Sequence, residues 1–337
     1  MKNAYLSQTA RLRANRLERA GSLLRIWLTK PRLLWSILTI KGAPSKLAHK
    51  ARWLDLASRM LRPLCCITWN VDQKVERIID HYGTICSLGG VLTPVWTFAT
   101  RELIDLRQIG PEYSIRIDEP EWMTGDGLTT ISIWHGIDRA FSLTFMLSRE
   151  GGRLTAYVGG LQGRGTGEAR QMYKQMTKDA HGMRPRDLTI EVSRMFFKAL
   201  GVTRVLAVAE MARNWNDRFA DEEFNYIASL DYDCAWEERG GKRLNSHWFR
   251  LPLDAQRRNE EDIPARKRAL YRQRYAMLEA IEASVAEAVA RLVPGSNRSQ
   301  PPGLPGPIAR SIQFSPNSKK RAALLVLAAT TFAWLAD

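Results

Sequence analysis

Residues 113–158 read YSIRIDEPEWMTGDGLTTISIWHGIDRAFSLTFMLSREGGRLTAYV, and this stretch decides the fold. It holds four short runs rich in β-branched and aromatic residues, namely YSIRIDE, LTTISIW, FSLTFML and LTAYV. Glycine-containing breaks separate them, GDG at 125–127 and EGG at 150–152. Such spacing is typical of short strands joined by tight turns. We therefore expect a meander of antiparallel strands.

Downstream of residue 158 the apolar residues change to a helical period. Two helices are expected around 169–180 and 188–200, with Gly201 where the second would end. The remaining expected elements are a buried strand at 203–209, a helix over about 217–229, strands near 232–236 and 245–253, and a long helix from Pro264 to about Leu292. Strands first, followed by helices alternating with strands, predict an α+β fold. Its sheet should be mixed and mainly antiparallel, flanked by helices, with a helical N-terminal region and a long C-terminal helix.

The composition is that of a globular protein, with 45% hydrophobic and 25% charged residues. It excludes wholesale disorder and a membrane protein with many spans. The 337 residues divide into a basic helical leader at 1–63, a single α+β domain at 64–293, a Pro/Gly-rich linker at 294–318 and a basic-flanked apolar tail at 319–337. Four cysteines without CxxC or zinc-ligand spacing predict neither a disulfide framework nor a metal site.

The net charge of +15 is concentrated in the leader. Residues 1–63 contain 14 Lys or Arg and 2 acids, a local charge of +12, which leaves +3 for the rest of the chain. Trp27, Trp35 and Trp53 are interleaved with these cations, as in amphipathic segments that lie on anionic membranes. Two alternatives stay open: the leader packs on the core with a solvated basic face, or it binds nucleic acid, although no recognised DNA or RNA module accompanies the charge.

The tail ends in 15 uncharged, mostly apolar residues at 322–336, directly after Lys319, Lys320 and Arg321. A spanning helix needs about 20 residues, so a short membrane contact is expected, with the body on the cytoplasmic side. Docking of the tail on the protein itself is the alternative. The longest clean apolar run of the leader, LLWSILTI, has 8 residues and no cleavage site, which argues against a signal peptide. The expected location is cytoplasmic, peripheral to the inner membrane.

A glycine-rich junction follows the last run of the meander: residues 155–176 read TAYVGGLQGRGTGEARQMYKQM. Backbone N–H groups of such a loop and the N-terminus of the next helix can bind an anion. The junction is neither a Walker A nor a Rossmann motif. It resembles the Q/R-x-x-G-x-G/A loop of the GNAT superfamily of acyltransferases, and the resemblance implies acyl-CoA as cofactor. The residues implied at its pyrophosphate are Gln162, Gly163, Arg164, Gly165 and Gly167. The alternative is a tight turn or β-bulge that requires glycine.

GNAT enzymes often use a tyrosine late in the fold as general acid, and Tyr226 and Tyr232 are the candidates in this chain. His181 is a candidate base, although no acidic partner is visible beside it in the sequence. In HGMRPRDL (181–188), Arg184 and Arg186 flank a proline suited to the first turn of a helix and could bind phosphate or carboxylate. Alternatively, these arginines pair with surface acids at a helix corner. Whether the chain is an enzyme stays open.

Five stretches together resemble the VirK/YbjX family of Gram-negative bacterial proteins over roughly residues 50–293. They are HYGTI (81–85), YVGGLQG (157–163), TKDAHGMRPRDL (177–188), YDCAWEERGG (232–241) and EDIPARKRALYRQRY (261–275). The resemblance implies a protein of unknown activity linked to virulence, tolerance of membrane-active peptides, and maturation or export of surface proteins, so surface-protein precursors are possible partners. It transfers no catalytic residue.

Three hypotheses follow. The first is a cytoplasmic protein attached peripherally to an anionic membrane surface that supports envelope integrity. The second is an acyl-CoA-dependent acyltransferase, and the third is nucleic-acid binding through the leader.

Overall fold

The computed structural model describes residues 62–92, 99–120, 123–164, 167–213, 230–255 and 257–292. All of them belong to one of two compact units of the chain, the unit formed by Lys30–Pro44 and Arg59–Pro294. The expected helix at 217–229, most of the leader and the whole tail lie outside the described residues. Within these residues, no helix combines the length and the apolar character that crossing a bilayer demands.

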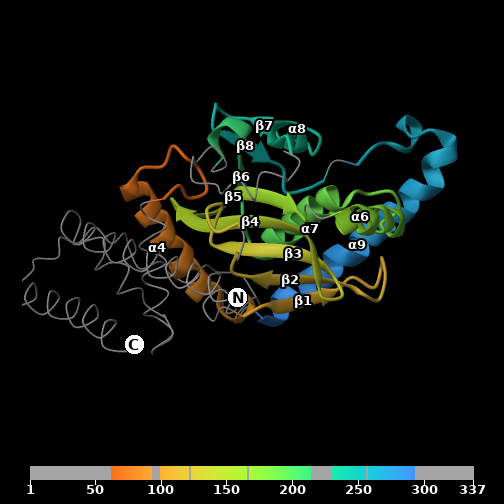
Figure 1. Cartoon of the computed structure of the whole chain (residues 1–337), viewed down its shortest axis with the longest axis horizontal. Coiled ribbons are helices and arrows are strands. Elements are labelled where there is room, and N and C mark those ends of the chain that lie inside the picture. The colour runs from red at the N-terminus through yellow and green to blue at the C-terminus, as the bar shows by residue number, and fades with distance from the viewer. Residues whose placement is uncertain are drawn as a thin grey trace, which may run out of the picture. The chain divides into compact units, whose positions relative to one another are not determined.

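The described residues form a sheet of eight strands in the order β1-β2-β3-β4-β5-β6-β8-β7 (Figure 1). The strands are β1 Arg101–Asp105, β2 Tyr113–Asp118, β3 Thr129–His135, β4 Asp138–Glu150, β5 Arg153–Gly163, β6 Arg204–Val208, β7 Lys242–Arg243 and β8 Trp248–Leu251. Every neighbouring pair is antiparallel except β5 and β6, which are parallel. The predicted α+β class with a mixed, mainly antiparallel sheet is confirmed.

The predicted meander at 113–158 is confirmed as β2 to β5. Its tightest turns lie where the sequence places glycine, at Gly136 between β3 and β4 and at Gly151 and Gly152 between β4 and β5. All three have positive φ, a conformation that other residues adopt only with strain. His135 and Asp138 are register partners on either side of the first of these turns.

The helices are α4 Val71–Leu88, α6 Gly167–Asp179, α7 Pro185–Ala199, α8 Tyr232–Glu237 and α9 Ala265–Leu292, with short 3₁₀ turns η1 Gly89–Leu92, η2 Glu210–Ala212 and η5 Glu260–Asp262. The helices expected around 169–180, 188–200 and 264–292 are confirmed, as are the strands at 203–209 and 245–253.

The strand predicted near 232–236 is wrong, because these residues form α8. The Asp231 side chain accepts a hydrogen bond from the Cys234 amide at 3.0 Å and so caps the first turn. Tyr232 and Trp236, four residues apart, then lie on one helical face and are both fully buried. The cap and this helical spacing outweigh the strand preference of the aromatic residues.

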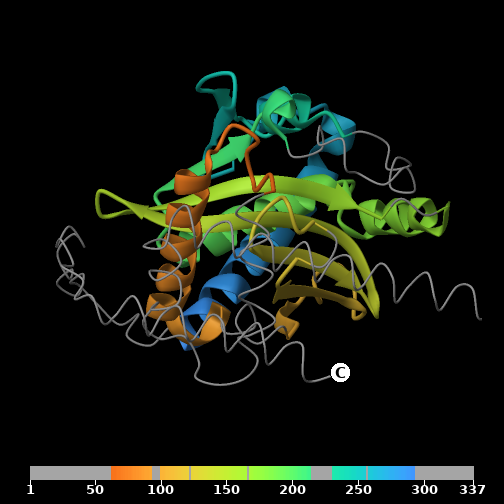
Figure 2. The same cartoon turned by 60° about the vertical axis from the view of Figure 1, so that its left-hand side comes forward.

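Helices cover both faces of the sheet: α4 packs on one face, and α7 and α9 pack on the other (Figures 1 and 2). Phe145 of β4 meets Phe197 of α7 edge to face, with ring centroids 4.9 Å apart. Three residues further along β4, Ser148 projects from the opposite face and bonds to Asp80 of α4 at 2.7 Å. The buried core therefore has two layers, one on each side of the central strands.

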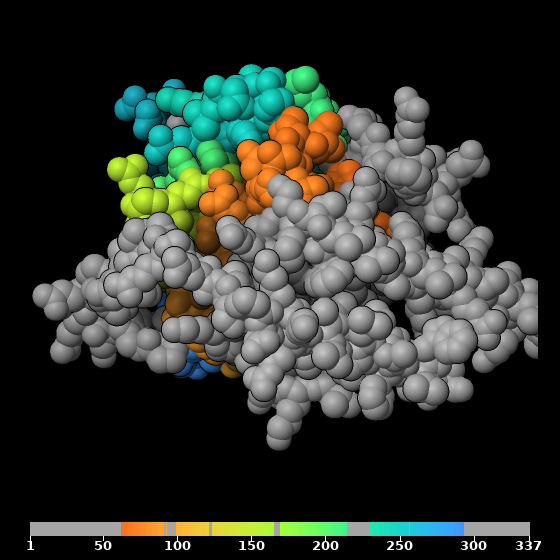
Figure 3. Space-filling model, turned by 90° about the vertical axis from the view of Figure 1, so that its left-hand side faces the viewer, coloured from red at the N-terminus to blue at the C-terminus, as the bar shows by residue number. Residues whose placement is uncertain are grey.

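His81, the histidine of the HYGTI stretch, has a structural role. Its ring is fully buried in α4, where Nδ1 accepts the Leu147 amide at 2.9 Å and Nε2 lies 3.1 Å from the Thr129 hydroxyl. This side chain attaches α4 to two strands. The segment before α4 lies beside the region of β7 and β8 (Figure 3), where the rings of Trp69 and Trp248 are 5.7 Å apart.

Candidate functional site

The glycine-rich junction connects β5 to α6, as the sequence predicts, but β5 is five residues longer than the expected run that ends at Val158. Gln162 and Gly163 are its last two residues, Arg164 follows, and α6 begins at Gly167. Gly165 lies outside the described residues. Gly159, Gly160 and Gly163 are therefore strand residues and not loop residues.

Close packing accounts for these three glycines. A Cβ atom at Gly159 would overlap the carbonyl oxygen of Asp126, and one at Gly160 would overlap Met123 and the Asp126 side chain. At Gly163 it would overlap the hydroxyl of Tyr173. The register of β4 and β5 also shifts between Thr144 and Phe145, opposite Gly159. The alternative of a bulge that needs glycine thus describes this part of the junction.

Arg164 already has partners within the protein. Its amide donates to the hydroxyl of Tyr173 on α6, which in turn donates to the Ala140 carbonyl at 2.9 Å. Its guanidinium pairs with Asp138 at the hairpin tip. Both members of this ion pair are substantially exposed, at 37% and 52% of their side-chain area, so an anionic ligand could replace Asp138 at little cost.

Tyr232 lies beside this junction. The pairing of β5 with β6 runs from Thr155 and Arg204 to Val158 and Ala207, and β5 then continues without β6. Over this extension the Tyr232 hydroxyl accepts the Leu161 amide at 2.5 Å and donates to the Leu161 carbonyl at 3.0 Å. The structure therefore brings Tyr232 next to the residue that precedes Gln162. Tyr226 lies outside the described residues.

Three charged residues that the sequence did not single out surround Tyr232. Arg213 lies 3.6 Å from the centre of its ring and pairs with Glu210 at 2.9 Å, and Glu210 accepts the Tyr232 amide at 3.0 Å. Asp126, half-buried against Gly160, is the third. Withdrawal from water raises the pKa of Asp126 to about 7, although Arg213 acts in the opposite direction. Burial likewise raises the pKa of Tyr232, which keeps its proton at neutral pH.

The raised pKa of Asp126 should be visible in stability. Between about pH 4 and pH 7 the folded chain holds a proton on Asp126 that the unfolded chain has released, so the free energy of unfolding falls as the pH rises through this window. We expect Asp126→Asn to remove this slope and to be more stable than the parent at pH 8, by about 1–3 kcal/mol once partial exposure is allowed for. Urea unfolding at pH 5, 6, 7 and 8 measures this. Asp105→Asn, at an exposed strand end, is the control and should leave the slope in place. A parental slope retained in Asp126→Asn would contradict the assignment.

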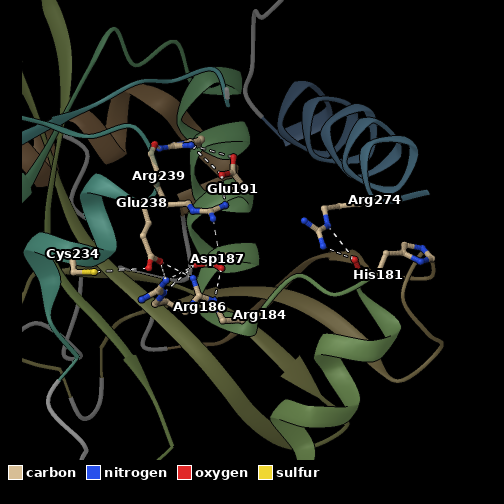
Figure 4. Close-up of polar contacts among 10 residues, drawn as sticks. His181, Arg184, Arg186, Asp187, Glu191, Cys234, Glu238, Arg239 and Arg274 are labelled. Carbon is tan, nitrogen blue, oxygen red and sulfur yellow. Dashed lines mark hydrogen bonds and ion pairs between the residues drawn. The ribbon is translucent and has the colours of Figure 1, made fainter. Parts of the chain in front are cut away.

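Arg184 and Arg186 form a network with carboxylates at the start of α7 (Figure 4). Arg184 contacts Asp187 at 2.8 Å and Glu238 at 2.6 Å. Arg186 contacts the same two carboxylates. Withdrawal from water acts to raise the pKa of Glu238, but hydrogen bonds from the two arginines outweigh it and hold the pKa below its usual range. The alternative expected from the sequence, in which these arginines pair with acids, therefore describes the structure. The ion pairs with Glu238 join the start of α7 to the end of α8.

His181 lies at the corner between α6 and α7 with a positive φ of 49°. Its carbonyl accepts two hydrogen bonds from Arg274 of α9, at 2.8 and 3.1 Å (Figure 4). The contact involves the backbone of His181 and not its ring. The structure thus gives Arg274 a positioning role for this corner and brings no carboxylate to the imidazole among the described residues.

The fold and these stretches define a class: the chain belongs to the family described as "Protein of unknown function (DUF535)", whose model matches residues 17–287. It is similar to the uncharacterized protein YbjX of Escherichia coli K12, with 32% identity over 237 residues that cover 68% of this chain and 71% of YbjX. An uncharacterized protein of Haemophilus influenzae is 28% identical over 220 residues, 65% of this chain and 71% of that protein. No solved structure matches the chain.

The resemblance to the VirK/YbjX family is confirmed by these relatives. The family match begins at residue 17, well before the start near residue 50 that the sequence motifs indicated, so most of the basic leader falls inside it. None of the comparisons supports the GNAT resemblance.

Proposed function

We propose that the chain transfers an acyl group from a coenzyme A thioester at the carboxyl end of the parallel pair β5–β6. The observation that carries this proposal is the meeting of the Tyr232 hydroxyl with the Leu161 backbone, directly before Gln162 and where β5 extends past β6. In sheets with parallel strands, ligands bind outside the carboxyl ends of those strands, at such a departure.

The junction supplies groups suited to the pyrophosphate of coenzyme A. The side chain of Gln162 makes no hydrogen bond to another described residue, and Arg164 has only an exposed partner in Asp138. The N-terminus of α6, a helix of 13 residues, adds backbone amides and a partial positive charge.

The chemistry would use one proton acceptor of the protein, Asp126, with Tyr232 in a positioning role. An amine or hydroxyl of the acceptor attacks the thioester carbonyl, the carbon–sulfur bond breaks, and the acyl group forms its new bond to the acceptor. Asp126, with a pKa of about 7, is suited to take the proton of the acceptor. Tyr232 is fully buried and its hydroxyl proton bonds to the Leu161 carbonyl, so it holds the end of β5 in position, and the departing thiolate takes its proton from water.

The test is a thermal shift of the full-length protein with acetyl-CoA and with longer acyl-CoAs. Ligand at 100 times its Kd stabilises by about 2.7 kcal/mol, which raises Tm by about 5–10 °C for a domain of this size. We expect Arg164→Glu to abolish the shift. Arg170→Glu, the same charge change at an exposed position of α6, should leave it intact. No shift with any acyl-CoA, or equal loss in both variants, would refute the site.

A second candidate function, peripheral attachment to the inner membrane from the cytoplasmic side, is supported by the charge of +12 in residues 1–63 against +3 elsewhere. Each basic residue near an anionic surface contributes about 1 kcal/mol. Attachment of this kind agrees with the envelope, peptide-tolerance, virulence and surface-protein roles that the family resemblance implies.

For this second candidate we expect the full-length protein to float with vesicles containing phosphatidylglycerol at low salt, and not with phosphatidylcholine vesicles. Raising the salt concentration should release it. A protein that stays in the soluble fraction under all these conditions would contradict membrane attachment. If duplex DNA, added at the same concentration of phosphate charges as the lipid, displaces the protein from the vesicles, nucleic-acid binding would be favoured instead.

A further inference from the structure

A hollow of about 560 Å³ lies between α7, the turn after α8, residues 253–255 and 257–258, and α9. It shares no lining residue with the β5–α6 junction. Its volume falls within the range of small-molecule sites, about 300–1,000 Å³. Five arginines face it together with two tyrosines: Arg194, Arg239, Arg257, Arg258, Arg274, Tyr271 and Tyr275.

Arg194 is the least exposed of these arginines. Its side chain is 3% exposed and pairs with the equally buried Glu191 at 3.0 Å, while a second nitrogen donates to the Arg239 carbonyl. Its Nε–H is buried and has no hydrogen-bond partner, and the same holds for the Nε–H of Arg239. A buried donor without a partner costs about 1–3 kcal/mol, so an acceptor that reached either Nε–H from the hollow would gain from satisfying it.

The charge around the hollow also favours an anion. The acids that line it are engaged: Glu238 with Arg184 and Arg186, Asp254 and Glu282 with Lys198, and Glu191 with Arg194. Arg239 lies 3.6 Å from Glu191 and Arg257 lies 2.7 Å from Glu279, whereas Arg258 and Arg274 form no ion pair with a carboxylate of the described residues. The wall therefore presents uncompensated positive charge to the space it encloses.

Two of the arginines, Arg257 and Arg274, are held in place before any ligand arrives. The guanidinium of Arg274 lies 4.4 Å from the centre of the Tyr271 ring and donates to the His181 carbonyl (Figure 4). That of Arg257 lies 5.2 Å from the Tyr275 ring, and the Tyr275 hydroxyl accepts the Arg258 amide at 3.1 Å. Fixed guanidinium planes bind phosphate oxygens in pairs and lose little freedom in doing so.

We propose that this hollow binds a small molecule through a phosphate or pyrophosphate group, with Arg194, Arg239, Arg258 and Arg274 as donors to its oxygens. A bare phosphate would fill only part of the space, so the group is carried by a larger molecule, and the tyrosine rings offer its remainder an apolar surface. The inference rests on the hollow and its unpartnered donors and is independent of acyl transfer.

The test is calorimetric titration of the full-length protein with inorganic pyrophosphate, ADP and a hexose phosphate. Arg258→Gln is the main variant, because the Arg258 side chain makes no bond to another described residue and its loss should not affect folding. We expect it to weaken binding by about ten- to a hundred-fold, as loss of a charged hydrogen bond does. Arg266→Gln, the same charge change at an exposed position in the first turn of α9, is the matched control and should leave Kd unchanged.

The three ligands distinguish a nucleotide from a sugar phosphate as the source of the group. Tight binding of any one that Arg258→Gln weakens and Arg266→Gln does not supports the site. Absence of binding by all three overturns it, as does equal weakening by both variants. Binding that Arg164→Glu abolishes and Arg258→Gln leaves intact would place the anion at the β5–α6 junction and likewise overturn this proposal, while leaving the proposed acyl transfer in place.

Discussion

Glu191→Leu should lower the free energy of unfolding by about 3–5 kcal/mol, because it leaves the Arg194 guanidinium buried without its counter-ion. Both side chains are at most 5% exposed, and the pair joins one turn of α7 to the Arg239 carbonyl beyond α8. Burial already lowers the pKa of Arg194 and Arg239 repels it, while Glu191 acts in the opposite direction. Urea unfolding of the full-length protein measures the effect.

The double variant Glu191→Leu/Arg194→Met should recover most of the lost stability, since an apolar pair of similar volume needs no desolvation of charge. Arg194→Met alone should cost less than Glu191→Leu, because Glu191 keeps the Arg239 guanidinium 3.6 Å away. If Glu191→Leu cost less than about 1 kcal/mol, the pair would have to be accessible to water, contrary to the structure.

Trp236→Ala should cost about 3–5 kcal/mol, as expected for removing a fully buried indole. The ring also donates its Nε1–H to the Val208 carbonyl at 2.9 Å and packs against Tyr232 with centroids 5.4 Å apart. Trp236→Phe keeps most of the volume and should lose a smaller amount, about 1–3 kcal/mol, from the unpaired carbonyl. Thermal and urea unfolding both measure these losses of stability.

Cys234→Ala on the same helix is the control for Trp236→Ala, because Cys234 is exposed and its side chain can be removed with a change below about 0.5 kcal/mol. An equal loss of stability in Cys234→Ala and Trp236→Ala would mean that α8 contributes through its helical backbone and not through the buried indole.

Features with local causes could be predicted from the sequence. The meander follows from alternating β-branched runs between glycine turns, and α7 follows from Pro185 and an apolar face. The end of β5 could not be predicted, because its glycines resemble a loop until the partners that pack on them, Asp126 and Tyr173, are known. For α8, the aromatic residues favoured a strand and the decisive signal was the Asp231 cap.

The candidate sites were predicted less completely, because their residues come together only in the folded chain. Tyr232 could be named as a tyrosine late in the chain, but its neighbours Asp126 and Arg213 come from distant turns with no local pattern. Glu191 and Arg194, three residues apart, look like an ordinary surface pair in the sequence. Only the approach of Arg239 from beyond α8 shows that they are buried.

The single parallel pair in the sheet has a consequence for how the chain assembles. Strands β1 to β5 join successive neighbours through connections of 2 to 10 residues, so each can pair as soon as the next has been synthesised. Strand β6 can join β5 only after the segment containing α6 and α7 has crossed over, and β8 and β7 attach to β6 in turn. Pairings across long separations form more slowly than local hairpins. Tyr232 reaches Leu161 only through this later half, so the meander should fold first and the proposed catalytic end should be the last part of the sheet to form.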